Sequence, residues 1–213
     1  MLEFFQNILG DTISIFTIMN PLSAGVIMLT LIDEDTSKSE FASIAFKNSR
    51  AVFIAMILLF LGGTYIFSFF GIQPDGLRIF GGIILLLMAF NMVQGHGKKV
   101  NHRAQDQVAA KEREDISTVP LAIPIIVGPG LATTLISLSL GSKTWQQYLS
   151  VSLAIFICSY ANYIILKRMP YIKRKLGTNG LKVFNRLMGL IVGSLASQMF
   201  ISGIVGLYKT YMS

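Results

Sequence analysis

Charged residues are scarce in this chain of 213 residues. They make up 14% of it, whereas hydrophobic residues make up 53%, and ordinary soluble domains contain about 25% charged residues. A soluble protein with so few charges would expose large apolar patches. The composition therefore excludes a soluble enzyme, a secreted disulfide scaffold and a nucleic-acid binder. The net charge of +7 is better explained by lysines and arginines in cytoplasmic loops of a membrane protein.

The sequence also lacks the residue patterns of catalytic and metal sites. Its single cysteine, Cys158, can form no intrachain disulfide. Its two histidines, His96 and His102, stand without the cysteine or carboxylate ligands that a metal site needs. It contains no glycine-rich phosphate loop, no HExxH and no GxSxG. We therefore expect no catalytic residues, no metal, no cofactor and no enzymatic activity.

Long apolar segments dominate what is present. A membrane-spanning helix needs about 20 apolar residues, and six segments fit that length. They lie at about 4–32, 50–72, 77–93, 117–140, 148–166 and 185–208. The sequence thus predicts an all-α polytopic membrane protein, with one transmembrane domain over residues 1–213 and the lipid bilayer as its main partner.

The basic residues indicate the orientation of these spans. With six spans, both termini lie on one face together with Arg78, Lys143 and Lys209, and the other 15 of the 18 lysines and arginines lie on the opposite face. Cytoplasmic loops of membrane proteins carry such an excess. We expect a multi-pass protein of the inner or plasma membrane, with both termini outside and basic cytoplasmic loops at 33–50, 95–116 and 167–186.

An internal similarity recurs at a spacing of 108 residues. This offset aligns Pro21 with Pro129, Arg78 with Arg186, and Gly81 with Gly189. Each half would hold three spans, so the second half would enter the membrane from the opposite side. The sequence therefore predicts two inverted-topology repeats, as in secondary transporters. Repeat one covers about 1–95, a cytoplasmic linker about 96–116, and repeat two about 117–213.

Helix-breaking residues fall within the first and fourth spans, at Asn20-Pro21 and at Gly128-Pro129-Gly130. Broken helices at membrane depth are tolerated only beside protein or a watery cavity, and in transporters they form substrate sites. We expect the substrate to be bound by residues around the two breaks. These are Asn20, Pro21, Ser23, Gly25, Gly128, Pro129, Gly130, Thr133 and Thr134.

Two arginines and a few polar residues leave alternatives open. Arg78 and Arg186 are either interfacial anchors, whose long side chains reach the headgroups, or partners for the ends of the broken helices. Few acidic residues lie within the spans, which favours sodium over a proton as coupling ion without deciding between them.

Asn162 could hold helices together or contact substrate. Glycine pairs such as Gly81-Gly82 indicate close helix packing and leave homo-oligomerisation open.

The chain resembles the MarC family of multi-spanning inner-membrane proteins. The resemblance covers nearly the whole chain and lies in an ordered set of motifs. These are Asn20-Pro21, Phe70-Gly71-Ile72, Leu77-Arg78-Ile79-Phe80-Gly81-Gly82, Pro120-Leu121-Ala122-Ile123-Pro124 with Gly128-Pro129-Gly130, and Arg186-Leu187-Met188-Gly189-Leu190. The resemblance implies transport of small neutral amino acids.

Together these features predict a secondary transporter of small neutral amino acids that works by alternating access between the two repeats. Two alternatives stay open: an efflux transporter or channel for another small solute, and a non-transporting membrane scaffold.

Overall fold

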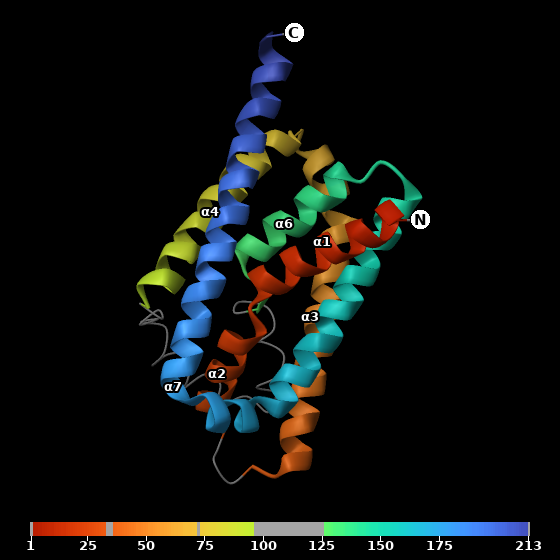
Figure 1. Cartoon of the computed structure of the whole chain (residues 1–213). Coiled ribbons are helices and arrows are strands. Elements are labelled where there is room, and N and C mark those ends of the chain that lie inside the picture. Colours follow the sequence, from red (N-terminus) through yellow and green to blue (C-terminus); the bar gives the residue numbers. More distant parts are fainter. Residues whose placement is uncertain (1, 33–35, 72, 96–125, 213) are drawn as a thin grey trace.

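The computed structural model describes residues 2–32, 36–71, 73–95 and 126–212. All regular structure in these ranges is helical (Figure 1). Four of the helical segments are long and apolar enough to cross a membrane: Glu3–Leu29, Lys38–Gly63, Pro74–Gln94 and Trp145–Met212, and a shorter apolar helix covers Pro129–Gly141. The part of the chain that the structure describes is therefore that of an all-α polytopic membrane protein, as its composition predicts.

The first apolar segment is interrupted in its middle. Helix α1 covers Leu2–Met19, α2 covers Pro21–Leu31, and Asn20 between them adopts a left-handed conformation with φ 45° and ψ 66°. Asparagine tolerates this conformation better than most residues. The proline ring suits the first position of a helix, because the N–H that it lacks would have no helical partner there. The break thus lies at the predicted Asn20-Pro21.

The next helices follow with proline at two further starts. Helix α3 covers Lys38–Phe69, α4 covers Pro74–Gln94, and α6 covers Pro129–Gly141. Gly128 caps α6 in an extended conformation, so a helix begins at the predicted Gly-Pro-Gly. The linker at 96–116 and the first residues of the expected fourth span, 117–125, lie outside the described residues.

Helix α7, Trp145–Met212, contains two helices joined at Gly177, whose φ of 65° and ψ of 174° are not helical. The chain reverses there, so residues 145–176 and 178–212 form two arms of α7 (Figure 1). The two predicted spans lie one on each arm. The prediction of a loop at 167–186 is wrong, because these residues are helical on both sides of Gly177. Its lysines, leucines and arginines are good helix formers, and only a glycine accepts the reversal readily. Likewise, α3 already begins at Lys38, within the expected loop at 33–50.

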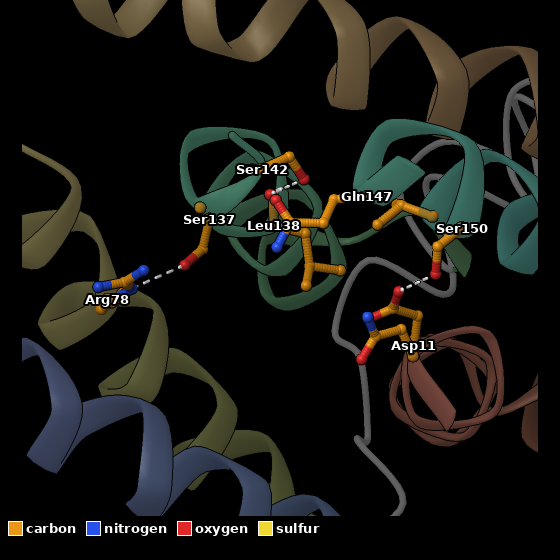
Figure 2. A pocket seen from close by; sticks show the side chains of 10 residues that line it. Asp11, Arg78, Ser137, Leu138, Ser142, Gln147 and Ser150 are labelled. Atoms are coloured by element: carbon orange, nitrogen blue, oxygen red, sulfur yellow. Dashed lines mark hydrogen bonds between the residues drawn. The ribbon is translucent and has the colours of Figure 1, made fainter. Parts of the chain in front are cut away.

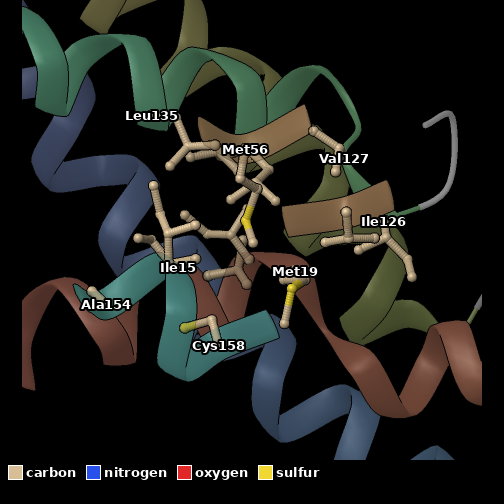
Figure 3. Packing of buried hydrophobic residues seen from close by; sticks show 14 of the residues in the cluster. Ile15, Met19, Met56, Ile126, Val127, Leu135, Ala154 and Cys158 are labelled. Atoms are coloured by element: carbon tan, nitrogen blue, oxygen red, sulfur yellow. The ribbon is translucent and has the colours of Figure 1, made fainter. Parts of the chain in front are cut away.

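The helices pack in a crossed arrangement. Helix α4 lies along α7, α2 packs on α7, and α6 packs on α3 and α4. A buried apolar cluster joins α1, α3, α4, α6 and both arms of α7 (Figure 3). Large apolar side chains such as Phe80, Leu87 and Phe90 point outward from α4, which suits contact with lipid. We call α2 and α6, the short helices that follow the two breaks, the half-helices. Each half-helix is thus held by helices that are distant from it in sequence.

Glycines let α4 and α7 approach closely. A Cβ atom added at Gly82 would lie 2.9 Å from the backbone nitrogen of Phe200, and one added at Gly189 would lie 2.8 Å from Cβ of Met92. The approach at Gly203 is equally tight, 2.7 Å from the carbonyl oxygen of Asp75. The close packing expected at Gly81-Gly82 is confirmed, and Gly189 and Gly203 pack as closely.

We predict that Gly82→Ala destabilises the protein, because the new methyl group meets backbone atoms that cannot rotate away. Overpacking of this kind costs about 1–3 kcal/mol. Gly62→Ala in α3 is the matched control, because its added Cβ meets nothing within 4 Å and alanine favours helix by about 1 kcal/mol. Thermal denaturation in detergent should show a lower midpoint for Gly82→Ala and an equal or higher one for Gly62→Ala. Equal midpoints for Gly82→Ala and wild type would contradict this packing.

Candidate functional site

The break before α2 holds three polar side chains in one hydrogen-bonded cluster. The side-chain nitrogen of Asn20 donates to Oγ of Ser23 at 2.8 Å and to Oδ1 of Asn185 at 2.9 Å. The Ser23 hydroxyl donates to the same Oδ1 at 2.7 Å. Asn185 lies on the second arm of α7, so the cluster fixes the start of α2 to a helix 162 residues further along the chain. We call Asn20, Ser23 and Asn185 the polar triad.

Asn20 also caps α2. Its Oδ1 accepts a hydrogen bond from the backbone nitrogen of Ser23 at 3.5 Å, which satisfies one of the N–H groups left free at a helix start. Asn20 is only 6% exposed. An uncapped start would be costly at such a buried position, so a single side chain provides both the cap and the link to α7.

The polar side chains of the second half-helix, α6, have hydrogen-bond partners of a different kind. The hydroxyls of Thr133 and Thr134 both donate to the carbonyl oxygen of Gly130, at 3.0 and 2.9 Å. Both threonines are buried, and Thr133 faces Gly81 of α4, where an added Cβ would lie 2.7 Å from its Oγ1. The threonine hydroxyls therefore bond within α6, whereas Asn20 and Ser23 bond across to α7.

The residues that precede the two breaks share one apolar core. Met19 precedes Asn20, Val127 precedes Gly128, and both belong to the buried cluster with Ile126 and Leu135 (Figure 3). The structure thus brings the two half-helix starts to the same core. Gly25, also a predicted site residue, serves close packing, because a Cβ there would lie 2.7 Å from Sδ of Met169.

The two arginines have different neighbours. Arg78 donates from Nη1 to Oδ1 of Asp75 at 2.9 Å and from Nε to Oγ of Ser137 at 3.3 Å. Ser137 lies in the C-terminal half of α6, so Arg78 connects the start of α4 to that half-helix. Arg186 lies beside Gly95, where an added Cβ would be 3.0 Å from its Nη2. Gly95 ends α4 in a left-handed conformation.

An open cavity of about 350 Å³, lined by both polar and apolar surface, lies between α1, α4, α6 and the start of α7 (Figure 2). Of the residues predicted for the site, Arg78 lines it. Asp11 of α1 also lines it and accepts a hydrogen bond from the Ser150 hydroxyl at 2.9 Å. The remaining lining residues come from the same four helices and the α6–α7 connection. They are Asn7, Ser137, Leu138, Gly141, Ser142, Gln147, Ser150 and Val151.

Sequence reasoning missed Asn185 and the cavity. Asn185 stands directly before Arg186 at the start of an apolar segment, and an asparagine there is costly in lipid unless it finds a partner. The sequence therefore indicates that Asn185 needs a hydrogen-bond partner, but it does not identify that partner. Asn162 is buried and donates to Oγ of Ser49 at 2.9 Å, which joins α7 to α3 as a helix-to-helix contact.

Comparison with known proteins identifies the family. A sequence model of MarC family integral membrane proteins matches residues 5–208. The chain belongs to the MarC family. Among its MarC relatives, a UPF0056 membrane protein of Aquifex aeolicus is 32% identical over 92% of both chains. Another, of Methanocaldococcus jannaschii, is 36% identical over 91% of this chain and 93% of its own. YvbG of Bacillus subtilis is 32% identical over 98% and 99%, respectively.

No solved structure matches this MarC chain. The names of these relatives describe membrane proteins and give no substrate. Membership in the MarC family therefore places the chain in the membrane as a multi-pass protein, in agreement with its apolar helices.

We predict that Ser23 and Asn185 stabilise the MarC fold through each other. In a double-mutant cycle, Ser23→Ala and Asn185→Ala should show a coupling energy of about 0.5–3 kcal/mol, as contacting residues do. The free energy of unfolding can be measured by titration with sodium dodecyl sulfate. Asn179→Ala is the control, because Asn179 is exposed on α7 and its loss should change stability by less than about 0.5 kcal/mol. Strictly additive effects at Ser23 and Asn185 would argue against the triad.

Proposed function

We propose that this MarC protein is a secondary transporter of small neutral amino acids, working by alternating access between two inverted three-helix repeats in the plasma membrane. One observation carries the proposal. Two half-helices, α2 and α6, begin with proline at positions that the 108-residue offset makes equivalent, and both start at one buried core. Paired broken helices of this kind are how transporters build a site near the middle of the membrane.

The packing of the half-helices supports the repeat. In the offset, α6 corresponds to α2, and α3 and α4 correspond to the two arms of α7. Helix α6 packs on α3 and α4, and α2 packs on α7, with Gly25 against Met169 of the first arm and Ser23 bonded to Asn185 of the second. Each half-helix thus rests on the long helices of the other half, as expected of two interleaved inverted repeats.

The two ends of the molecule differ in a way that suits a carrier. The cavity is lined by residues of α1, α6 and the α6–α7 connection, and these segments lie at the end that carries the N-terminus (Figure 1). Helix α2, which begins at the triad, runs from there toward the reversal of α7 (Figure 1). By the excess of lysine and arginine, the reversal of α7 would lie in the cytoplasm. The cavity would then face outward while the triad closes the cytoplasmic side.

The substrate chemistry follows from the half-helix starts. A helix N-terminus favours an anionic group, so the starts of α2 and α6, beside Pro21 and Pro129, would receive a substrate carboxylate. Asn20, Ser23, Thr133 and Thr134 would exchange their present hydrogen bonds for bonds to substrate. Sodium or a proton would provide the coupling.

Uptake into proteoliposomes tests the proposal. Labelled alanine and glycine would be offered to the purified protein under an imposed sodium gradient, under a proton gradient and without a gradient. Accumulation that depends on one gradient and is reduced by unlabelled serine is the expected result. Flux that no gradient drives uphill would indicate a channel, and no flux above empty liposomes would overturn amino-acid transport.

We expect the half-helix start of α6 to be required for that flux. Pro129→Ala with Gly130→Ala should leave membrane insertion intact and reduce uptake at least tenfold, because the chain could then continue as helix through the break. Pro74→Ala with Gly76→Ala at the start of α4 controls for the residue types where no half-helix begins, and Gly130→Ala alone controls for overpacking, because an added Cβ there would lie 2.6 Å from Cδ2 of Leu85. Wild-type uptake by the Pro129 and Gly130 variant would remove the broken helix from the mechanism.

A further inference from the structure

We propose that Asp11 is the residue that takes up the coupling proton, from the water of the open cavity. The assignment rests on the proposed function, because it names the ion and the side chain through which transport would be driven. Three observations carry it. Asp11 is a carboxylate in the middle of an apolar helix, it lines the cavity without a salt-bridge partner among the described residues, and its hydrogen bond joins the two repeats.

The position of Asp11 differs from that of the other acidic residues on the described helices. Glu3, Glu40 and Asp75 all lie in the first turn of a helix, where the helix dipole favours a negative charge. Asp11 lies in the middle of α1, within the apolar segment Glu3–Leu29. Acidic residues inside membrane-spanning segments are costly and mark pathways for ions or protons. The position of Asp11 therefore indicates a function.

The charge of Asp11 is not neutralised by a salt bridge within the part of the chain that the structure describes. Its Oδ2 accepts a hydrogen bond from the Ser150 hydroxyl at 2.9 Å (Figure 2), and Ser150 is only 1% exposed. Arg78 lines the same cavity, but its salt bridge among the described residues is to Asp75. A bound proton would cancel the charge of Asp11, and the open cavity gives water a path to the carboxylate.

The helices packed against α1 present few other titratable groups to Asp11. Helices α6 and α7 pack on α1, and their residues that line the cavity carry no charge, so Arg78 of α4 is the other charged residue in its lining. On α7, the Cys158 thiol donates to the carbonyl oxygen of Thr12, and the Tyr148 hydroxyl donates to the carbonyl oxygen of an α6 residue. Proton exchange with the cavity is therefore assigned to Asp11.

The lining of the cavity favours a proton over a metal cation such as sodium. A metal cation of this kind is held by several oxygen atoms at once. Oε1 of Gln147 already accepts from two backbone nitrogens, at 2.7 and 3.2 Å. The Ser142 hydroxyl donates to a backbone carbonyl oxygen at 2.8 Å, and the Ser150 hydroxyl donates to Asp11. A sodium ion would have to replace such bonds, whereas a proton needs only the carboxylate.

The bond between Asp11 and Ser150 connects the proton to alternating access. Asp11 lies in repeat one, and Ser150 lies on the first arm of α7, in repeat two. A hydrogen bond to an ionised acceptor is about twice as strong as a neutral one, so a proton on Asp11 weakens this link. Transporters of this class move one repeat against the other. Proton uptake would thus loosen α1 from α7 beside the cavity.

Counterflow and proton-driven uptake in proteoliposomes test the assignment together. In counterflow, liposomes filled with unlabelled alanine exchange it for labelled alanine without an ion gradient, so the carrier need not release its proton. Asp11→Asn keeps an acceptor for Ser150 and imitates the uncharged carboxyl. We expect it to retain counterflow and to lose at least tenfold of the uptake that a proton gradient drives. Glu3→Gln is the matched control, because Glu3 is exposed on the same helix and does not line the cavity, and it should keep both activities.

A second pair of variants tests the role of the hydrogen bond. Ser150→Ala keeps the carboxyl and removes its donor, so it should change the external pH at which proton-driven uptake is half-maximal. Ser152→Ala is the control, because its hydroxyl donates to the Tyr148 carbonyl oxygen within the same helix, at 2.8 Å, and its pH profile should match that of wild type. Identical profiles for Ser150→Ala and wild type would overturn the link between this bond and proton uptake.

The outcomes separate this assignment from the proposed function. Wild-type proton-driven uptake by Asp11→Asn would overturn the assignment while transport stands, as would uptake by the wild-type protein that only a sodium gradient drives. Loss of counterflow in a folded Asp11→Asn protein would place Asp11 in substrate binding and overturn its role as the proton site. If that variant does not fold, Asp11→Ser takes its place with the same expectations. A wild-type protein that shows neither counterflow nor uptake would overturn the proposed function and the assignment with it.

Discussion

Unpaired backbone deep inside an apolar protein is the constraint on which the rest of this structure depends. Where a helix starts in such a place, its free N–H groups need partners, because lipid provides none. At α2 the chain meets this requirement with Asn20, which caps the helix, and with proline, which has no N–H to satisfy. At α6 proline again stands at the first position, where it has no N–H to satisfy, and the cap residue is Gly128, which offers no side chain.

The long helices α4 and α7 pack against the starts of α2 and α6. Gly177 reverses α7 so that its second arm presents Asn185 to Asn20 and Ser23. Glycines at Gly81 and Gly82 let α4 approach α6 on one side and α7 on the other. The same close approaches that stabilise the fold also place polar groups at the breaks. In the proposed cycle, the bonds of the triad would be exchanged for bonds to substrate, while the glycine contacts persist.

Much of this arrangement could be predicted from local sequence. Proline after asparagine and within Gly-Pro-Gly predicts helix starts, because the reason is local backbone chemistry, and closely spaced glycines predict helix contacts. The continuation of α7 through 167–176 could not be predicted in the same way, because the charges there indicate an aqueous environment and do not exclude a helix. The link from Asn20 to Asn185, and the cavity between Asp11 and Arg78, depend on contacts between distant segments. A sequence without its relatives aligned contains no information about such pairs.

The most direct test of alternating access is to lock the triad. Ser23→Cys with Asn185→Cys, in a Cys158→Ala background, places one thiol at the Ser23 Oγ and the other at the Asn185 Cγ, which carries the Oδ1 that lies 2.7 Å from that Oγ. A mercuric ion bridging the two sulfurs would hold α2 against α7. If the triad must open in each cycle, bridging will abolish amino-acid uptake, and a competing dithiol will restore it, whereas mercuric ion will not change the uptake of either single-cysteine protein relative to its untreated form. Unchanged uptake by the fully bridged protein would contradict the account.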